Sequence, residues 1–290
     1  MDHLFSVSAD CQDVSYSDTE VIFPQIKRVT RIAVLGQISA FYVQTSMGDG
    51  PPRNIRTATG RNMVLYSSLS HVPPWQHVDL LANLIRIVPV FRSEHKKHHT
   101  PALVITVCDH DTRMLSLVDS PFTVDVSKTA LVAMYENELT VQFRTFRSGL
   151  FFFSLSDHGD VLIAQITQGT IQVIFDFGSL SPSKISGGRA LDDGEWHEMR
   201  WVHQFDSVQL SIDGVMLNQT TPTGLYRKLD LHSQVHVAGR PPDDFSPGVE
   251  SSFHGCLARM LLNGVDLLSH APSDLDAPCQ VGIFGKSIRI

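Results

Sequence analysis

The stretch that most constrains the fold is residues 253–268, FHGCLARMLLNGVDLL, which a further cysteine follows at Cys279. A Phe-x-Gly-Cys step leads here into an apolar segment, and Asn263-Gly264 comes directly after it. Glycine accepts the positive φ that a tight hairpin turn requires, so this stretch predicts a strand, a turn and a returning strand. An Asn-Gly turn alone suits any hairpin. The two cysteines on either side of the turn, Cys256 and Cys279, are a further feature that a simple hairpin does not explain.

Most of the chain carries strand patterns, and we find no convincing long amphipathic helix. Apolar and polar residues alternate, as in half-buried strands, at residues 29–34, 84–88, 103–107, 139–144, 161–166, 171–175 and 208–212. Turn residues separate these segments at positions 158–160, 168–169, 186–188, 213–214 and 263–264. Strands at this spacing predict an all-β fold made of sandwiches or jelly rolls.

Length and composition favour two domains and exclude some functions. A chain of 290 residues with 42% hydrophobic side chains can bury more than one core. The formal net charge of −7, from 30 acidic and 23 basic residues, argues against a general nucleic-acid binder. No segment approaches the roughly 20 consecutive apolar residues that cross a bilayer, and the N-terminus lacks the pattern of a secretory signal. We therefore expect a soluble chain without a visible export signal or membrane anchor.

The second half of the chain resembles a laminin G domain. Residues 252–266, SFHGCLARMLLNGVD, are similar to its closing strand, in wording closest to the contactin-associated proteins, the Caspr and neurexin IV group. Residues 143–152 resemble its opening strands, residues 192–197 its acidic loop and Trp-His step, and residues 208–214 its next hairpin. We interpret Trp196 as a core residue rather than a ligand-stacking aromatic, and His197 as structural.

The first half resembles, more diffusely, a discoidin (coagulation factor 5/8 C-type) domain. The resemblance rests on residues 26–37, on residues 64–68 with Trp75, and on residues 84–89 and 103–108. Residues 11–26 are too short to hold the opening strands of that family, so the first domain is expected to be shortened. We thus predict a discoidin-like β-sandwich or jelly roll at residues 1–110, a laminin G-like β-sandwich at residues 111–282, and a tail at 283–290. A discoidin module before a laminin G module is the arrangement that begins the contactin-associated proteins.

The four cysteines fall into two pairs by position, Cys11 with Cys108 and Cys256 with Cys279, each closing one predicted domain. Neither pair has the spacing of a zinc or redox motif, and structural disulfides belong to oxidising compartments. Four buried free thiols in a cytosolic protein are the alternative. The sequon Asn218-Gln219-Thr220 also fits secretion and predicts glycosylation of Asn218.

Two weaker sites follow from the resemblance and from charge. Many laminin G domains hold calcium at a rim, and Asp160 lies where the first aspartate ligand would fall. Calcium needs six to eight oxygens, and since we find no second ligand, the preferred interpretation of Asp160 is a turn residue. The basic run at residues 92–99, with Arg92, Lys96 and Lys97, fits a glycan or an anionic lipid surface, or simply a solvated loop. Phe41 and Tyr42 fit either apolar spikes or a strand interior.

Nothing in the sequence supports catalysis, since it has no Gly-x-Ser-x-Gly elbow, phosphate-binding loop or His-Glu-x-x-His motif. We expect a non-enzymatic extracellular or cell-surface binding module for adhesion at cell junctions, with no cofactor other than a possible calcium ion. The resemblance implies cell-adhesion partners of the contactin or immunoglobulin type, and membrane-anchored full-length relatives. Glycan or anionic-lipid binding through residues 92–99 is an alternative, and a truncated product without independent function is another.

Overall fold

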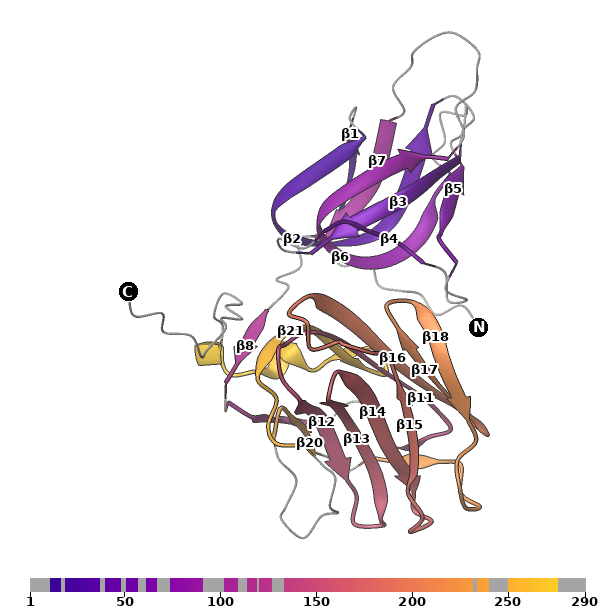
Figure 1. The fold of residues 1–290 in the computed structure, drawn as a ribbon, viewed down its shortest axis with the longest axis vertical. Helices are drawn as coiled ribbons and strands as arrows, with labels where there is room; N and C mark the ends of the chain where they lie inside the picture. Colours follow the sequence, from indigo (N-terminus) through magenta and orange to yellow (C-terminus); the bar gives the residue numbers. More distant parts are fainter. Residues whose placement is uncertain are drawn as a thin grey trace. The chain divides into compact units, whose positions relative to one another are not determined.

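The computed structural model describes residues 11–16, 19–36, 40–47, 51–56, 61–66, 74–90, 102–108, 114–118, 120–126, 133–231, 234–239 and 250–275. The chain divides into two compact units, Met1–Thr112 (unit 1) and Arg113–Ile290 (unit 2). Both are built from antiparallel β-sheets (Figure 1), which confirms the predicted all-β fold. In the described part of the chain, no helix is long and apolar enough to cross a membrane.

Unit 1 contains one seven-stranded sheet in the order β1-β7-β2-β6-β3-β4, with β5 paired to β3. Its strands are β1 (Cys11–Tyr16), β2 (Glu20–Leu35), β3 (Ala40–Ser46), β4 (Arg53–Asn54), β5 (Val64–Tyr66), β6 (Gln76–Pro89) and β7 (Ala102–Cys108). The predicted strands at residues 29–34, 84–88 and 103–107 lie in β2, β6 and β7, so these three predictions are confirmed.

The long strands β2 and β6 shape unit 1. Their pairing shifts register twice, between Ile22 and Lys27 and between Val29 and Arg31, and both strands curve strongly in Figure 1. Register shifts of this kind bend a sheet, so one sheet can gather apolar side chains of several strands into a common core. Phe41 is buried in that core, which fits a strand interior rather than a loop spike. The discoidin-like character of unit 1 stays a prediction.

A disulfide closes unit 1. Cys11 opens β1 and stands opposite Cys108, the last residue of β7, and their sulfurs are bonded, which is the pairing that the sequence predicted. The bridge spans 97 residues, and closing a loop of this length stabilises a fold by about 4–5 kcal/mol in the chain-entropy account. Cys256 is also disulfide-bonded, and its predicted partner Cys279 lies outside the described residues.

Unit 2 is a sandwich of a seven-stranded and a six-stranded sheet (Figure 1), with a two-stranded pair β10-β19 beside them. The first sheet has the order β18-β17-β16-β11-β21-β22, with β8 paired to β21, and the second has the order β15-β14-β13-β12-β20-β9. The strands are β8 (Leu115–Leu117), β9 (Phe122–Asp125), β10 (Ala133–Met134), β11 (Glu136–Arg144), β12 (Gly149–Leu155), β13 (Asp160–Thr167), β14 (Thr170–Phe177), β15 (Ser183–Gly187), β16 (Trp196–Gln204), β17 (Ser207–Ile212), β18 (Val215–Thr220), β19 (Leu229–Asp230), β20 (Gln234–Val237), β21 (Gly255–Leu262) and β22 (Val265–Asp266). Two 3-10 helices follow, η1 (Leu268–His270) and η2 (Ser273–Leu275).

Local sequence rules account for much of this sandwich. All four predicted strands of the second half lie within β11, β13, β14 and β17. At Gln168-Gly169, Asp213-Gly214 and Asn263-Gly264 both residues of the turn have positive φ, which is the geometry of a two-residue type I′ hairpin. The hairpin that the sequence predicted after residue 262 therefore forms, as β21 and β22.

The prediction for Trp196 is wrong. Along β16 the odd-numbered side chains are buried and the even-numbered ones are not, because successive residues of a strand point to opposite faces. Trp196 therefore lies on the outer face, half-buried, while Trp201 is fully buried and packs against Phe175 with ring centroids 6.0 Å apart. Trp201 is the tryptophan of the core.

Candidate functional site

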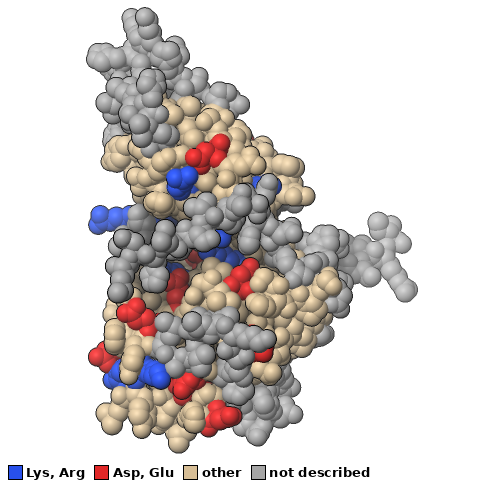
Figure 2. Space-filling view, turned by 180° about the vertical axis from the view of Figure 1, so that it is seen from behind, with Lys and Arg blue, Asp and Glu red and all other residues tan. Residues whose placement is uncertain are grey.

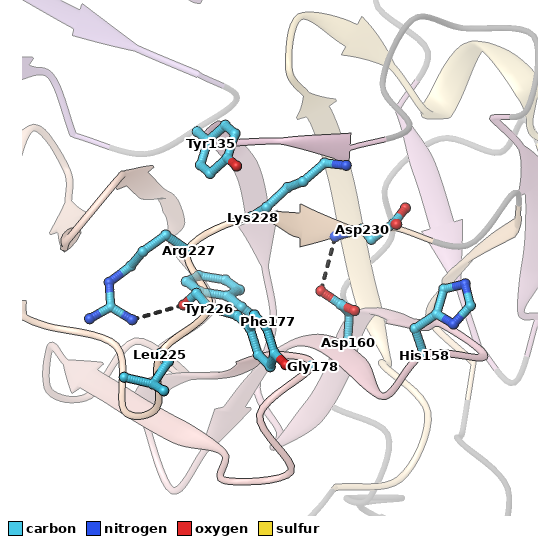
Figure 3. A pocket seen from close by; sticks show the side chains of 10 residues that line it. All are labelled: Tyr135, His158, Asp160, Phe177, Gly178, Leu225, Tyr226, Arg227, Lys228 and Asp230. Carbon is cyan, nitrogen blue, oxygen red and sulfur yellow. Dashed lines mark hydrogen bonds between the residues drawn. The ribbon is translucent and has the colours of Figure 1, made fainter.

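One end of the unit 2 sandwich holds a pocket of about 580 Å³. Figure 3 shows the ten side chains around it, which come from loops and strand ends rather than strand centres. Its lining residues are Tyr135, His158, Asp160, Phe177, Gly178, Leu225, Tyr226, Arg227, Lys228 and Asp230. Loop-built concave sites on a rigid scaffold are where binding surfaces concentrate.

Asp160 forms the buried acidic wall of the pocket. It is the first residue of β13 and pairs with Phe177, the last residue of β14. Its Oδ1 accepts the backbone N–H of Asp230 at 3.0 Å, and its Oδ2 accepts the Ser156 hydroxyl at 3.3 Å. Burial raises the pKa of Asp160 despite these hydrogen bonds, and the charges of Asp230 and Asp176 add to the rise. Asp160 is thus more than a solvated turn residue.

Asp230 is a site residue that sequence reasoning missed. The short strand β19 pairs with β10, so that Ala133 lies opposite Asp230 and Met134 opposite Leu229. This pairing brings Asp230 to the same pocket as Asp160, 70 positions earlier in the chain. No local pattern marks Asp230, because a two-residue strand has too few positions to show alternation.

Large exposed hydrophobic side chains surround the pocket. We call them the rim surface: Tyr135, Leu180, Phe205, Leu225 and Tyr226. Leu225 is 93% exposed and Leu180 is 84% exposed. The rings of Tyr135 and Phe205 stack with centroids 5.7 Å apart, and Leu180 lies against Gly159, beside the pocket. The rim surface includes five of the eleven exposed large hydrophobic side chains in the described residues, so they are concentrated at this end.

The loop that carries Leu225 and Tyr226 is held in place by hydrogen bonds. Arg227 forms an ion pair with Asp206 and donates from Nη1 to the carbonyls of Gly224 and Tyr226, both at 2.8 Å. Upstream, the backbone N–H of Thr223 donates to the Ser183 hydroxyl at 2.8 Å. Arg227 is therefore paired with Asp206, and these contacts fix the positions of Leu225 and Tyr226 in the rim surface.

A partly buried chain of hydrogen bonds supports the rim surface. The backbone N–H of Glu138 donates to Asn263 Oδ1 at 2.7 Å, which orients that amide so that its Nδ2 donates to Asn137 Oδ1 at 3.0 Å. Asn137 Nδ2 then donates to His203 Nδ1 at 3.0 Å, and His203 Nε2 donates to the Phe205 carbonyl at 3.0 Å. Since a backbone N–H can only donate, every amide and the histidine tautomer in the chain are fixed.

His203 is therefore held neutral. It is fully buried, and its ring packs against Phe177 of the pocket with centroids 4.3 Å apart. Burial lowers the pKa of His203, with a smaller lowering by the charge of Arg227, and the hydrogen bond to Phe205 only partly offsets this. A proton on Nδ1 would face the Asn137 amide donor, so protonation requires the chain of hydrogen bonds to break.

At the opposite end of β16, His197 has two carboxylates as partners. His197 Nδ1 contacts Asp213 Oδ2 at 2.9 Å, and its Nε2 contacts Asp193 Oδ1 at 3.2 Å. Burial alone would lower the pKa of His197, but the hydrogen bonds and charges of Asp213 and Asp193 outweigh it and raise the pKa. His197 ties the acidic loop to the Asp213-Gly214 turn, as expected of a structural residue.

The pocket's side chains do not complete a calcium site. Asp160 and Asp230 offer two carboxylates, whereas calcium takes six to eight oxygens. Within the described residues, no group of three or more His, Cys, Asp or Glu side chains is arranged to hold a metal. Lys228 also lines the pocket and brings positive charge to it. Calcium at Asp160 stays a prediction that backbone carbonyls and water would have to complete.

The other predicted site residues lie apart from this pocket or outside the described chain. Asn218 is exposed in β18, whereas Arg92, Lys96 and Lys97 fall outside the described residues. On the face drawn in Figure 2, acidic and basic side chains of the described residues are interspersed. That face therefore does not show the single-sign charge of a polyanion-binding surface.

Part of unit 2 matches a known protein family. Residues 143–265 match the laminin G domain family. The chain also resembles domains LG4-5 of the mouse laminin alpha1 chain, with 21% identity over 57% of this chain and 45% of that chain, and a TM-score of 0.50. At this identity the likeness shows the fold alone.

The whole chain is similar to neurexin-like receptors. It is 57% identical over 274 residues to "Neurexin like receptor 1" of Caenorhabditis elegans, a match that covers 94% of this chain and 23% of the relative. It is 29% identical over 185 residues to "Neurexin-2" of Mus musculus, covering 58% of this chain and 11% of that protein. The chain thus spans about a quarter of the length of the first relative. These likenesses support an extracellular binding module of the adhesion type.

Proposed function

We propose that this chain is a non-catalytic, extracellular binding module in cell adhesion and that it recognises a protein partner through the rim surface. The observation that carries the proposal is the concentration of exposed large hydrophobic side chains around the Asp160 pocket. Water-exposed apolar patches are unfavourable for an isolated soluble protein and commonly mark interaction sites. The rim surface supplies both the apolar area and a concave centre.

The composition of the rim surface suits a protein partner. Tyrosine and other aromatic side chains are enriched among the residues that dominate protein interfaces, and the rim presents Tyr135, Phe205 and Tyr226. The hydrogen bonds of Arg227 and Thr223 order the Leu225 loop in advance, so less conformational entropy is lost when a partner binds.

For the partner we propose cell-adhesion proteins of the contactin or immunoglobulin type at cell junctions, as the resemblance implies. Unit 1 takes part in this proposal as a shortened discoidin-like module, supported by its curved antiparallel sheet and the Cys11–Cys108 bridge. Glycan or anionic-lipid binding by residues 92–99 is the alternative. Binding of a polyanion to these basic residues would release counterions, so its affinity should fall strongly as the salt concentration rises.

The test is binding of the secreted chain to cells that display a panel of immunoglobulin-type adhesion ectodomains, at low and high salt. The double variant Leu225→Ala and Tyr226→Ala should weaken binding about tenfold or more, or about 1.4 kcal/mol. Tyr66→Ala, which removes an exposed aromatic of unit 1, is the matched control and should bind like the wild type. Repeating the assay with calcium or a chelator tests the Asp160 prediction.

Three results would contradict the proposal. The rim variant could bind as tightly as the wild type, which would place the interface elsewhere. Binding could instead disappear at high salt and in a Lys96→Ala and Lys97→Ala variant, which would favour the glycan or lipid alternative. If no member of the panel is bound, the proposed partner class is wrong.

A further inference from the structure

Strand β18 differs from the other end strands of four or more residues in the described part of the chain. These are β1, β9 and β15, and each contains a charged residue, namely Asp13, Asp125 and Lys184, whereas the two- or three-residue end strands β5, β8 and β10 contain none. β18 has the sequence VMLNQT, without charge or proline. Charges and prolines on edge strands oppose pairing with a second chain, so β18 lacks the usual protection.

β18 is also exposed, so a second chain could reach this edge, which has no charged residue or proline. Four consecutive residues, from Met216 to Gln219, are exposed, and Met216 and Leu217 are 48% and 44% exposed. Uncharged segments with apolar side chains on an open edge are the ones that add strands from other molecules.

The two halves of β18 are protected unequally. Its pairing with β17 shifts register between Leu210 and Ser211, which leaves Leu217 as an extra residue in the ladder. Leu217 also packs over Gly187 of β15. A bulge of this kind disturbs the ladder and hinders further pairing. Beyond it, Asn218 to Thr220 pair regularly with β17, so this half presents a regular edge.

The regular half coincides with the sequon Asn218-Gln219-Thr220. Asn218 is exposed, and its Nδ2 donates to the Ser186 carbonyl at 3.1 Å. In N-glycosylation, Nδ2 bonds to the anomeric carbon of a lipid-linked oligosaccharide. The bond from that carbon to the lipid diphosphate breaks, and Nδ2 loses one of its two protons. The remaining N–H can still donate to Ser186, so the modification is compatible with the observed contact.

We propose that an N-linked glycan on Asn218 guards the open edge of β18 against pairing with a second copy of this chain. The glycan replaces the edge charge that β18 lacks, because a bulky hydrated group on the strand prevents another backbone from approaching. The inference is independent of the rim surface and of its partner.

The experiment compares secreted variants by light scattering after size-exclusion chromatography over a range of concentrations, with glycan occupancy from mass spectrometry. Asn218→Gln and Thr220→Val both remove the sequon and should associate, with at least a twofold rise in apparent mass. Asn218→Lys removes the glycan but supplies an edge charge, so it should stay monomeric. Thr220→Ser keeps the sequon and should match the wild type.

The proposal fails if the wild type carries no glycan at Asn218, if both unglycosylated variants remain monomeric, or if Asn218→Lys associates as strongly as Asn218→Gln. Cooperative thermal unfolding of each variant separates edge pairing from misfolding. An Asn218→Gln protein that associates only after losing its cooperative transition would also overturn the proposal.

Discussion

The two ends of strand β16 hold buried histidines whose pKa values are shifted in opposite directions. His197 is clamped between two aspartates, and its pKa is raised. His203, six positions later, has an amide donor on one nitrogen and a backbone carbonyl on the other, and its pKa is lowered. Both side chains are buried on the same face of the strand. The direction in which the pKa of a buried histidine shifts therefore depends on its hydrogen-bond partners, and burial alone does not decide it.

The hydrogen-bond partners of the two histidines also differ in how far they are exposed to solvent. At the His197 end the partners are partly exposed, with side-chain exposures of 42% for Asp193 and 36% for Asp213. At the His203 end, Asn137 and His203 are buried and Asn263 is half-buried, and Phe177 and Phe205 of the pocket end contact this chain. The pocket and its rim are thus supported by side-chain amides and His203, without a side-chain carboxylate in the chain of hydrogen bonds.

The largest effect is expected from His203→Ala. The substitution leaves a cavity beside Phe177 and removes the partners of Asn137 Nδ2 and the Phe205 carbonyl. Such losses in a core destabilise a protein by about 3 kcal/mol. His197→Ala is the matched comparison and should cost about 1 kcal/mol, since its aspartates can be solvated. Denaturant unfolding measures both, and equal losses would show that the two ends are energetically alike.

The pH dependence should have opposite signs at the two ends. Because the pKa of His203 is lowered on folding, its contribution to stability is complete above the unfolded pKa of about 6.5 and is lost as the pH falls below it. Because the pKa of His197 is raised, its contribution is complete below about 6.5 and is lost as the pH rises through the folded pKa. His203→Gln should reduce the loss of stability in acid, and His197→Gln the loss in base, each by up to about 1.4 kcal/mol per unit of pKa shift.

Asn137→Asp gives the control for this second prediction. It places a carboxylate beside His203 Nδ1, which copies the partner type of His197 and should raise the pKa of His203 by about one unit or more. Nuclear magnetic resonance titration of the ring protons measures the shift. The charged neighbour Arg227 opposes the change, whereas Phe177 and Val208, on the strands packed against the ring, are uncharged. An unchanged pKa in this variant would contradict the role assigned to the Asn137 amide.

The smallest effect is expected from Asp193→Asn. Asp193 contributes the longer contact to His197 and is 42% exposed, so solvent screens it and the loss of stability should be at most about 0.5 kcal/mol. The pKa of His197 should fall while Asp213 still holds it above the unfolded value. Titration of His197 in Asp193→Asn and in Asp213→Asn shows which aspartate raises the pKa of His197 more. We expect Asp213 to have the larger effect, and a larger fall of the pKa in Asp193→Asn would contradict this.

The sequence by itself determined several of the strands and turns of this chain, although the turn predicted at residues 186–188 begins inside β15. The alternation at residues 139–144, 161–166, 171–175 and 208–212 corresponds to β11, β13, β14 and β17, and the Asn263-Gly264 turn has the positive φ that its residues favour. These features depend on near neighbours in the chain, so local rules suffice to predict them. The Cys11–Cys108 pair was also identified, since few cysteines leave few pairings.

Only the tertiary structure decided which side chains meet at the site. Which tryptophan enters the core was settled by the register of β16, whose alternation directs Trp201 inward and Trp196 outward. Asp230 joins Asp160 from 70 positions away, and Asn263 reaches Asn137 from 126 positions away. Such contacts are set by sheet pairing over long separations, and a one-residue change of register would reverse every face. For that reason much of the framework of strands could be predicted from the sequence, whereas the pocket, its rim and the neutral state of His203 follow from how the strands pair.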